Sequence, residues 1–188
     1  MTGATPLPLY AIGLGSNRRH GRFGDPRRVL LAALAALESE GIEPVDASPI
    51  ISSAPLGPSR RRYANAVALV VSPLDPPAML ARLKAIEAAF GRRIGQRWGA
   101  RTLDLDILLW SGGAWSDDRL TIPHPAMAER PFVLGPLTRI APGWRHPLAA
   151  RSIRQLATTL ARAKPVDRAP LAHEGGRPLS HGRPTATR

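Results

Sequence analysis

The sequence predicts an α+β fold of the ferredoxin-like kind, an α/β sandwich in which helices cover a largely antiparallel sheet. Strand-like and helical segments follow one another as β-α-β-β-α-β, with further helical segments after them. Both internal helices begin with an Asp-Pro pair and end at a glycine. The chain has 188 residues, of which 44% are apolar, which suits a single domain.

The first part of the chain supplies one helix between two strand-like segments. Residues 8–14 are apolar and predict a short buried strand. A turn is expected to close that strand, and its residues are Gly13, Gly15, Ser16 and Asn17. Asp25 and Pro26 predict a helix over 26–40. Residues 42–52 are strand-like, but two prolines place them at a sheet edge or a bulge.

The next strand displays an aromatic ring beside an amide. Residues 63–71 alternate in character, so Tyr63 and Asn65 stand on one face of the predicted strand. A second Asp-Pro pair then predicts a helix that runs to Phe90.

The strand predicted over 102–110 carries two carboxylates. Asp104 and Asp106 share one face of it, with alpha carbons roughly 6 to 7 Å apart. The opposite face is expected to carry Leu103, Leu105, Ile107 and Leu109. A helical segment should begin at Pro131, and the capping box of Ser152 and Gln155 predicts a last helix to about residue 163.

Composition excludes several classes of chemistry. The chain has no cysteine, which rules out disulfides, thiolate metal sites and a cysteine nucleophile. No apolar stretch is long enough for a membrane helix and no leader is recognisable, so we expect a cytoplasmic monomer without a membrane partner. Residues 1–164 should form one domain, and 165–188 a disordered basic tail rich in proline and glycine.

The charge leaves the partner open at this point. The formal net charge is +12, and 24 of the 26 basic residues are arginines, because the two lysines are Lys84 and Lys164. A basic surface attracts polyanions, which include nucleic acids, anionic membranes and the phosphates of a nucleotide.

The aspartate pair is the sharpest chemical signal. Two carboxylates on one face can hold a divalent cation or two closely spaced ones, and Mg²⁺ prefers one or two carboxylates with waters and substrate phosphates. The alternative is an exposed polar face, but the neighbouring strand residues are apolar, so unpaired acids there would repel one another. The sequence therefore favours a metal site at Asp104 and Asp106.

Arginines surround this predicted site. A cationic loop beside a metal site is the arrangement that phosphoryl transfer needs. The loop arginines are Arg92, Arg93, Arg97 and Arg101. His124, between two prolines, either donates to a phosphate or ends a strand. The chain has neither a Walker A motif nor a full dinucleotide fingerprint, so an ATP site must be built differently.

Several motifs occur in a fixed order between residues 9 and 147. They are Gly15-Ser16-Asn17, Ala54-Pro55-Leu56-Gly57-Pro58, Tyr63-Ala64-Asn65-Ala66, Arg97-Trp98-Gly99, Arg101-Thr102-Leu103-Asp104-Leu105-Asp106 and Ile122-Pro123-His124-Pro125. In these motifs the chain resembles the 6-hydroxymethyl-7,8-dihydropterin pyrophosphokinases of folate biosynthesis. The resemblance implies an ATP-dependent diphosphokinase that transfers the pyrophosphoryl group of ATP to the pterin hydroxymethyl group and releases AMP.

The resemblance also implies roles for individual residues. Asp104 and Asp106 would hold two Mg²⁺ and act in catalysis with Arg92 and Arg101. The residues that would bind ATP are Lys84, Glu87, Arg93, Arg97, Trp98, Ile107, Arg119, Thr121, His124 and Arg130. Those that would bind the pterin are Ser53, Leu56, Tyr63, Asn65 and Phe132. The loop from Gly91 to Trp98 is one residue shorter than in well-known members, so a second loop arginine corresponds to Arg93 or to no residue.

Two hypotheses follow from the sequence. The first is the pterin pyrophosphokinase, with ATP and the hydroxymethyldihydropterin as its substrates and no nucleic-acid partner. The alternative is a basic nucleic-acid-binding domain without catalysis, which the charge suggests but which low aromatic content and the absence of a nucleic-acid motif weaken.

Overall fold

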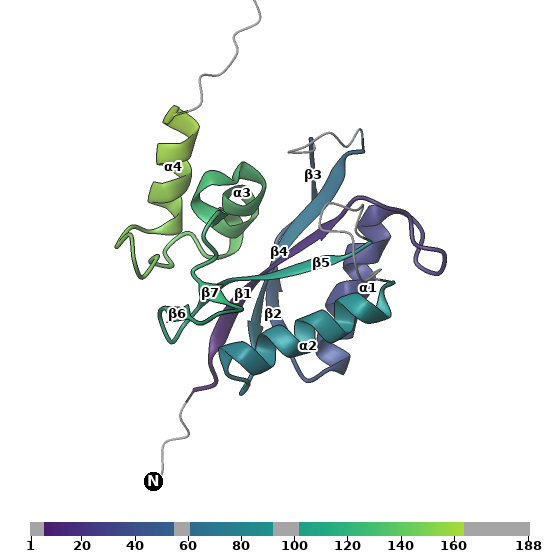
Figure 1. The fold of residues 1–188 in the computed structure, drawn as a ribbon. Helices are drawn as coiled ribbons and strands as arrows, with labels where there is room; N and C mark the ends of the chain where they lie inside the picture. The colour runs from purple at the N-terminus through teal and green to yellow at the C-terminus, as the bar shows by residue number, and fades with distance from the viewer. Residues whose placement is uncertain (1–5, 55–60, 92–101, 164–188) are drawn as a thin grey trace, which may run out of the picture.

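The structure is a computed structural model that describes residues 6–54, 61–91 and 102–163. Its elements in chain order are β1 (Leu9–Ser16), α1 (Pro26–Ser39), β2 (Glu43–Ala47), β3 (Ile51–Ser53), β4 (Tyr63–Val71), α2 (Pro76–Ala89), β5 (Asp104–Trp110), β6 (Trp115–Ser116), β7 (Thr121–Ile122), the 3-10 turn η1 (Met127–Glu129), α3 (Pro131–Ile140) and α4 (Ile153–Ala163). The predicted order of helices and strands is confirmed for the main elements, but residues 42–52 form two strands and two short strands follow β5 (Figure 1).

The main sheet is antiparallel, with strand order β2-β4-β1-β5. β3 also pairs with β4, so β2 and β3 are two halves of one edge that the sequence predicted as a single strand-like segment. Ser48 joins the halves, since its N–H donates to Val67 O at 2.9 Å and its Oγ accepts from Val67 N at 3.0 Å. The register shifts between Pro44 and Asp46, which confirms the expected bulge.

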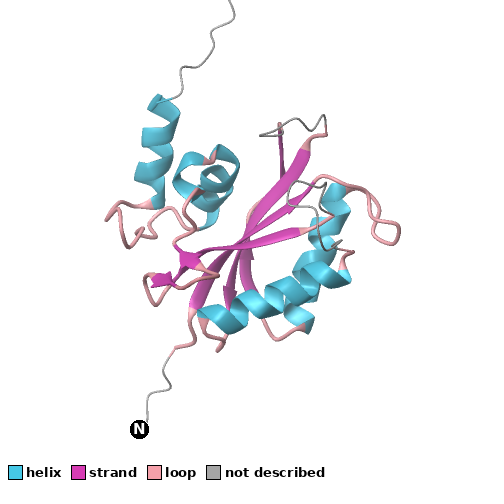
Figure 2. Cartoon of the chain, viewed as in Figure 1, coloured by secondary structure: helices cyan, strands magenta, loops and turns pink. Residues whose placement is uncertain are grey.

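Helices cover both faces of the sheet and create two cores (Figures 1 and 2). On one face, alternate residues of β1 pack against α1 and α2. On the other face, Ala11 and Val67 pack against α3 and α4. The first core includes Tyr10, Ile12, Leu14, Leu30, Leu37, Met79 and Leu83, and the second includes Leu69, Leu109, Leu134, Leu137, Ile153 and Leu156.

Local capping sets the ends of the helices as the sequence predicted. The Oδ1 atoms of Asp25 and Asp75 accept from the backbone N–H groups three residues later, at 3.1 and 2.9 Å. Gly41 and Gly91 follow the two helices with φ of 74° and 83°, a backbone region that favours glycine.

The predicted capping box of α4 is confirmed. Ser152 N donates to Gln155 Oε1 at 2.9 Å, and Gln155 N donates to Ser152 Oγ at 3.2 Å.

Two details of the sequence prediction were wrong. β1 runs through Ser16, so Gly13 and Gly15 lie inside a strand and not in a turn. Leu109 lies on the α3–α4 side and not with Leu105, because Ala11 pairs with Leu109 while Ile12 pairs with Ile107. Leu108 is therefore the extra residue of a β-bulge, which changes the face on which the following side chain lies.

A short hairpin, β6–β7, was not predicted. Asp117 holds its turn, because its Oδ1 accepts from Arg119 N at 2.7 Å and from Leu120 N at 2.8 Å. Its Oδ2 accepts from Trp115 Nε1 at 2.8 Å.

None of the helices in the described residues combines the length and the apolar character that a membrane span requires. The predicted tail, residues 165–188, lies outside the described part of the chain.

We predict that two leucines of α1 contribute very differently to stability. Leu37 is fully buried between α1 and the sheet, whereas Leu31 is 53% exposed. Leu37→Ala should lower the free energy of unfolding by about 2–5 kcal/mol, and Leu31→Ala by less than about 0.5 kcal/mol. Urea denaturation measures both, and equal effects of the two variants would contradict the assigned packing face of α1.

Candidate active site

Glycines of the central strand form the floor of the candidate site. In β1, Gly13 pairs with Asp106 and Gly15 pairs with Asp104, while Gly15 also pairs with Asn65 of β4. A Cβ at Gly15 would lie 3.6 Å from Asn65 Oδ1 and 3.9 Å from Asp104 Cβ. Glycine in a strand interior permits close approach of a ligand or of neighbouring groups. At Gly15 the α3–α4 face is therefore open between the amide of Asn65 and the side chain of Asp104, whereas the side chain of Leu108 covers Gly13.

The two carboxylates are half-buried neighbours on this face. Burial raises the pKa of Asp106, and repulsion by Asp104 raises it further. Three positive or ionisable groups oppose that shift, and they are His124, Lys84 and Arg130. Such a pair favours a cation between or beside the carboxylates.

Within the described residues, the candidate metal ligands at this site are the two carboxylates. Among residues 6–54, 61–91 and 102–163, no cluster of three or more acidic or histidine side chains could hold a metal ion. Mg²⁺ suits a site with one or two carboxylates, because water and phosphate oxygens complete its octahedral coordination. The donor set of Asp104 and Asp106 therefore fits Mg²⁺ delivered with a phosphate-bearing substrate.

The outer edge of β5 is held by two side chains of α2. Leu105 N donates to Glu87 Oε1 at 2.8 Å, and Lys84 Nζ donates to Leu105 O at 3.2 Å. Lys84 Nζ also donates to Glu87 Oε1 at 2.5 Å. Since β5 ends the sheet, these bonds satisfy backbone groups that would otherwise lack a strand partner. Glu87 is only 1% exposed, and its carboxylate binds the backbone of Leu105, the residue between the two aspartates.

The bulge in β5 positions His124. His124 N donates to Leu108 O at 3.0 Å, and His124 Nδ1 accepts from Ala126 N at 3.1 Å. Burial lowers the pKa of His124, and the neighbouring Asp106 opposes that shift. A neutral ring whose Nδ1 accepts a hydrogen bond carries its proton on Nε2. His124 is therefore set up as a hydrogen-bond donor near Asp106.

Arg130 and Phe132 flank the start of α3. The guanidinium carbon of Arg130 lies 5.9 Å from the centroid of the Phe132 ring, within cation–π range. Arg130 also acts electrostatically on both Asp106 and His124. This end of α3 brings a cation and an aromatic ring to the same face as the carboxylates.

The predicted pterin-side residues of β3 and β4 lie together. Asn65 Nδ2 donates to Ser53 Oγ at 2.8 Å, and Ser53 pairs with Tyr63 across the two strands. The hydrogen bond fixes the orientation of the amide, because the nitrogen is the end that donates.

Other predicted site residues do not join this group. Ile107 packs in the α1–α2 core on the opposite face, and Arg119 and Thr121 are exposed on the β6–β7 hairpin. Six predicted residues lie outside the described part of the chain, namely Leu56, Arg92, Arg93, Arg97, Trp98 and Arg101. The sequence did not predict the roles of Gly13, Gly15 and Leu108. Two glycines at alternate positions of an apolar strand could have indicated that one face of that strand is left free of side chains.

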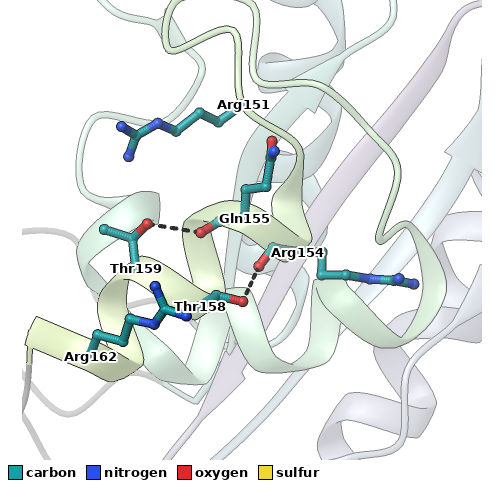
Figure 3. Close-up of a pocket in the computed structure, with 6 residues that line it drawn as sticks. All are labelled: Arg151, Arg154, Gln155, Thr158, Thr159 and Arg162. Carbon is teal, nitrogen blue, oxygen red and sulfur yellow. Dashed lines mark hydrogen bonds between the residues drawn. The ribbon is translucent and has the colours of Figure 1, made fainter.

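A second concave surface lies away from the aspartates. Figure 3 shows a groove on α4 and the turn before it, lined by Arg151, Arg154, Gln155, Thr158, Thr159 and Arg162. The hydroxyls of Thr158 and Thr159 donate to carbonyls of their own helix at 2.9 and 3.0 Å. The groove contains no carboxylate, so the Asp104–Asp106 face is the candidate active site.

Comparisons with known proteins agree with this geometry. Residues 11–142 match the family model of 7,8-dihydro-6-hydroxymethylpterin-pyrophosphokinase. The chain belongs to this family. It is accordingly a pyrophosphokinase, which confirms the resemblance in its motifs and supports the first of the two hypotheses.

Relatives with the same activity in their names cover most of the chain. A 2-amino-4-hydroxy-6-hydroxymethyldihydropteridine pyrophosphokinase of Synechocystis sp. is 41% identical over 145 residues, which are 77% of this chain and 72% of that protein. The pyrophosphokinase of the same name from Pseudomonas aeruginosa is 43% identical over 138 residues, 72% of this chain and 82% of that protein.

A solved structure confirms the fold. The crystal structure of an HPPK-DHPS in complex with substrates superimposes with a TM-score of 0.65 at 14% identity. The match covers 84% of this chain, and this chain spans 44% of the length of that one.

We predict that the clamp on β5 is a large contribution to stability. Glu87→Ala removes the acceptor of Leu105 N–H and leaves Lys84 without that carboxylate, so the free energy of unfolding should fall by about 2–4 kcal/mol. The matched control is Glu38→Ala, on the exposed side of α1, with a change below about 0.5 kcal/mol. Chemical denaturation that gave both variants the same stability would contradict a structural role for Glu87.

We predict that Asp106 destabilises the metal-free protein. Its pKa is raised in the folded state, so the charged carboxylate opposes folding, and this penalty disappears as the pH falls through the raised pKa. In EDTA, Asp106→Asn should raise the Tm near pH 7.5, and the gain should shrink as the pH approaches the unfolded value of about 3.9.

The control for this prediction has the opposite sign. A hydrogen bond from Trp115, with backbone bonds from Arg119 and Leu120, lowers the pKa of Asp117. The charged form of Asp117 therefore supports folding above its unfolded pKa, and Asp117→Asn should lower the Tm near pH 7.5. Differential scanning calorimetry distinguishes the two, and a lower Tm for Asp106→Asn in EDTA would contradict the electrostatic interpretation.

Proposed function

We propose that the chain transfers the pyrophosphoryl group of ATP to the hydroxymethyl group of 6-hydroxymethyl-7,8-dihydropterin in folate biosynthesis. The products are the pterin diphosphate and AMP. The observation that supports this reaction is the pair Asp104 and Asp106 on one sheet face with Asn65, across a glycine floor, in a chain of the pterin pyrophosphokinase family.

Asp104 and Asp106 would hold two Mg²⁺ together with the phosphates of ATP. The raised pKa of Asp106 reflects burial and a like charge, both of which a divalent cation relieves. Mg²⁺ held by these two carboxylates would supply positive charge that stabilises the phosphates during transfer. Because Leu105 between the aspartates is held from the α2 side, the two carboxylates keep one face toward the phosphates.

His124 and Arg130 would bind the phosphates. The neutral ring of His124 presents Nε2–H near Asp106, and Arg130 supplies a permanent positive charge there. Donors and cations fixed before the reaction stabilise charge without reorganisation. The further ATP-binding residues that we propose from the family resemblance are Lys84, Glu87, Arg93, Arg97, Trp98, Ile107, Arg119 and Thr121, with Arg92 and Arg101 in catalysis. Of these, Ile107 lies in the α1–α2 core and would need a ligand that reaches that side of β5.

The pterin would lie on the β3–β4 side of the glycine floor. Tyr63 and Phe132 supply aromatic faces for a flat heterocycle, and Asn65, Ser53 and Leu56 would meet its edge. In this arrangement the hydroxymethyl oxygen loses its proton to the surrounding water and attacks the β-phosphorus of ATP. The bond from that phosphorus to the oxygen shared with the α-phosphate breaks, and AMP leaves with that oxygen.

The same proposal covers the organisation of the chain. We propose that residues 1–164 act as one catalytic domain, because the described elements from β1 to α4 pack on a single main sheet. That this domain acts as a monomer stays a prediction of the sequence. A cytoplasmic location and a disordered tail stay predictions of the sequence.

We predict that AMP forms only when the pterin, ATP and Mg²⁺ are present together. Asp104→Ala and Asp106→Ala should each lower kcat at least about 100-fold, because each removes a carboxylate that holds the metal beside the phosphates. Chromatographic separation of the nucleotides measures turnover and identifies AMP against ADP.

Asp46→Ala is the matched control for these variants. Asp46 is an exposed strand carboxylate at the far edge of the sheet, and its removal should leave turnover unchanged. Full turnover in either site variant would refute the metal assignment, and ADP as the product would refute pyrophosphoryl transfer.

A further inference from the structure

A buried amide directly after β1 has an unsatisfied oxygen. Asn17 is only 3% exposed, yet its Oδ1 accepts no hydrogen bond within the part of the chain that the structure describes. Buried polar groups in native proteins almost always have a partner, and an acceptor withdrawn from water without one opposes folding. Such a group is retained at a functional site when a ligand supplies the missing partner.

The position of Asn17 places it beside the glycine floor. Along β1, Gly13 and Gly15 occupy alternate positions on the site face, and Asn17 is the next residue in that alternation. The antiparallel register of β1 with β4 ends at Ser16 opposite Ala64, and Asn17 is the first residue beyond it. If the strand alternation extends by this one residue, Asn17 continues the face on which Asn65 and Asp104 flank Gly15.

The backbone at this position is anchored. Ser16 Oγ donates to Thr102 O at 2.6 Å, which ties the end of β1 to the residues that precede β5. The anchor limits the freedom of Asn17 to turn its amide toward solvent, which is consistent with its burial.

The neighbouring amide shows which ligand chemistry fits. Asn65 Nδ2 is committed to Ser53 Oγ, so Asn65 turns its oxygen toward Gly15. Asn17 thus adds a second amide oxygen one step further along the same face. Two acceptors suit a ligand edge that carries N–H donors, whereas a phosphate offers acceptors that both oxygens would repel.

We propose that Asn17 is a further pterin-binding residue, whose Oδ1 accepts a hydrogen bond from an N–H group of the bound heterocycle. This inference rests on the proposed function, because it takes the pterin as the molecule between Tyr63 and the glycine floor. The pterin carries an exocyclic amino group and ring N–H groups, so it supplies the donor that the substrate-free protein lacks.

The test separates the two substrates. Asn17→Ala should raise the KM for the pterin and its Kd by about 10-fold, while the KM for ATP changes less than about 2-fold. The substrate-free Tm should not fall, because the side chain makes no hydrogen bond through its oxygen that the variant loses. Asn17→Leu, which keeps the volume without polar atoms, should have a Tm at or above that of the wild type.

Ser48→Ala is the matched control. Ser48 is also a buried polar residue, but its Oγ accepts from Val67 N and donates to Pro49 O. Its replacement should lower the Tm and leave both KM values unchanged. The contrast with Asn17→Ala distinguishes a ligand-binding amide from a structural one.

Several results would overturn the proposal. A pterin KM equal to that of the wild type would do so, as would an equal rise in both KM values or a failure of both Asn17 variants to fold. Wild-type turnover is measured first, because an inactive wild type refutes the proposed function. An active wild type with an indifferent Asn17→Ala variant refutes only the role of Asn17.

Discussion

The site depends on one small set of hydrogen bonds at the outer edge of β5, where Glu87 and Lys84 hold the backbone of Leu105. On its inner edge the same strand pairs with β1. A strand fixed on both edges cannot rotate, so Asp104 and Asp106 cannot relieve their repulsion by moving apart. The protein thus keeps two like charges close together, an arrangement that favours a cation beside them.

The glycines of β1 have a matching role on the ligand side. Gly13 leaves room for the side chain of Leu108, whose Cδ2 would lie 3.3 Å from a Cβ at that position, and Leu108 is the bulged residue whose carbonyl binds His124. Gly15 keeps the space between Asn65 and Asp104 free. Because glycine has no side chain, Gly15 sets the depth of the site, and Gly13 leaves the space for Leu108, whose carbonyl holds His124.

Sequence patterns predicted the parts of the fold that neighbouring residues decide. Asp25, Asp75 and the capping box of α4 act over three residues, and alternation along β4 is a property of the strand itself. Contacts between distant residues were beyond such patterns. Glu87 meets Leu105 from another element, and the bulge that turns Leu109 to the second core arises in the pairing of β5 with β1. Motif order located the aspartates, His124 and Asn17, but only the packing shows that the amide oxygen of Asn17 is buried without a partner among the described residues.

The two cores described above face different selective demands. The α1–α2 core contains apolar side chains for which volume and shape are the main requirement, so substitutions there are tolerated when they preserve packing. The α3–α4 side must also keep donors, charges and open space in register with a substrate. A redesign for thermal robustness therefore has its freedom among the apolar side chains beneath α1 and α2, but not at Lys84 and Glu87, which hold β5.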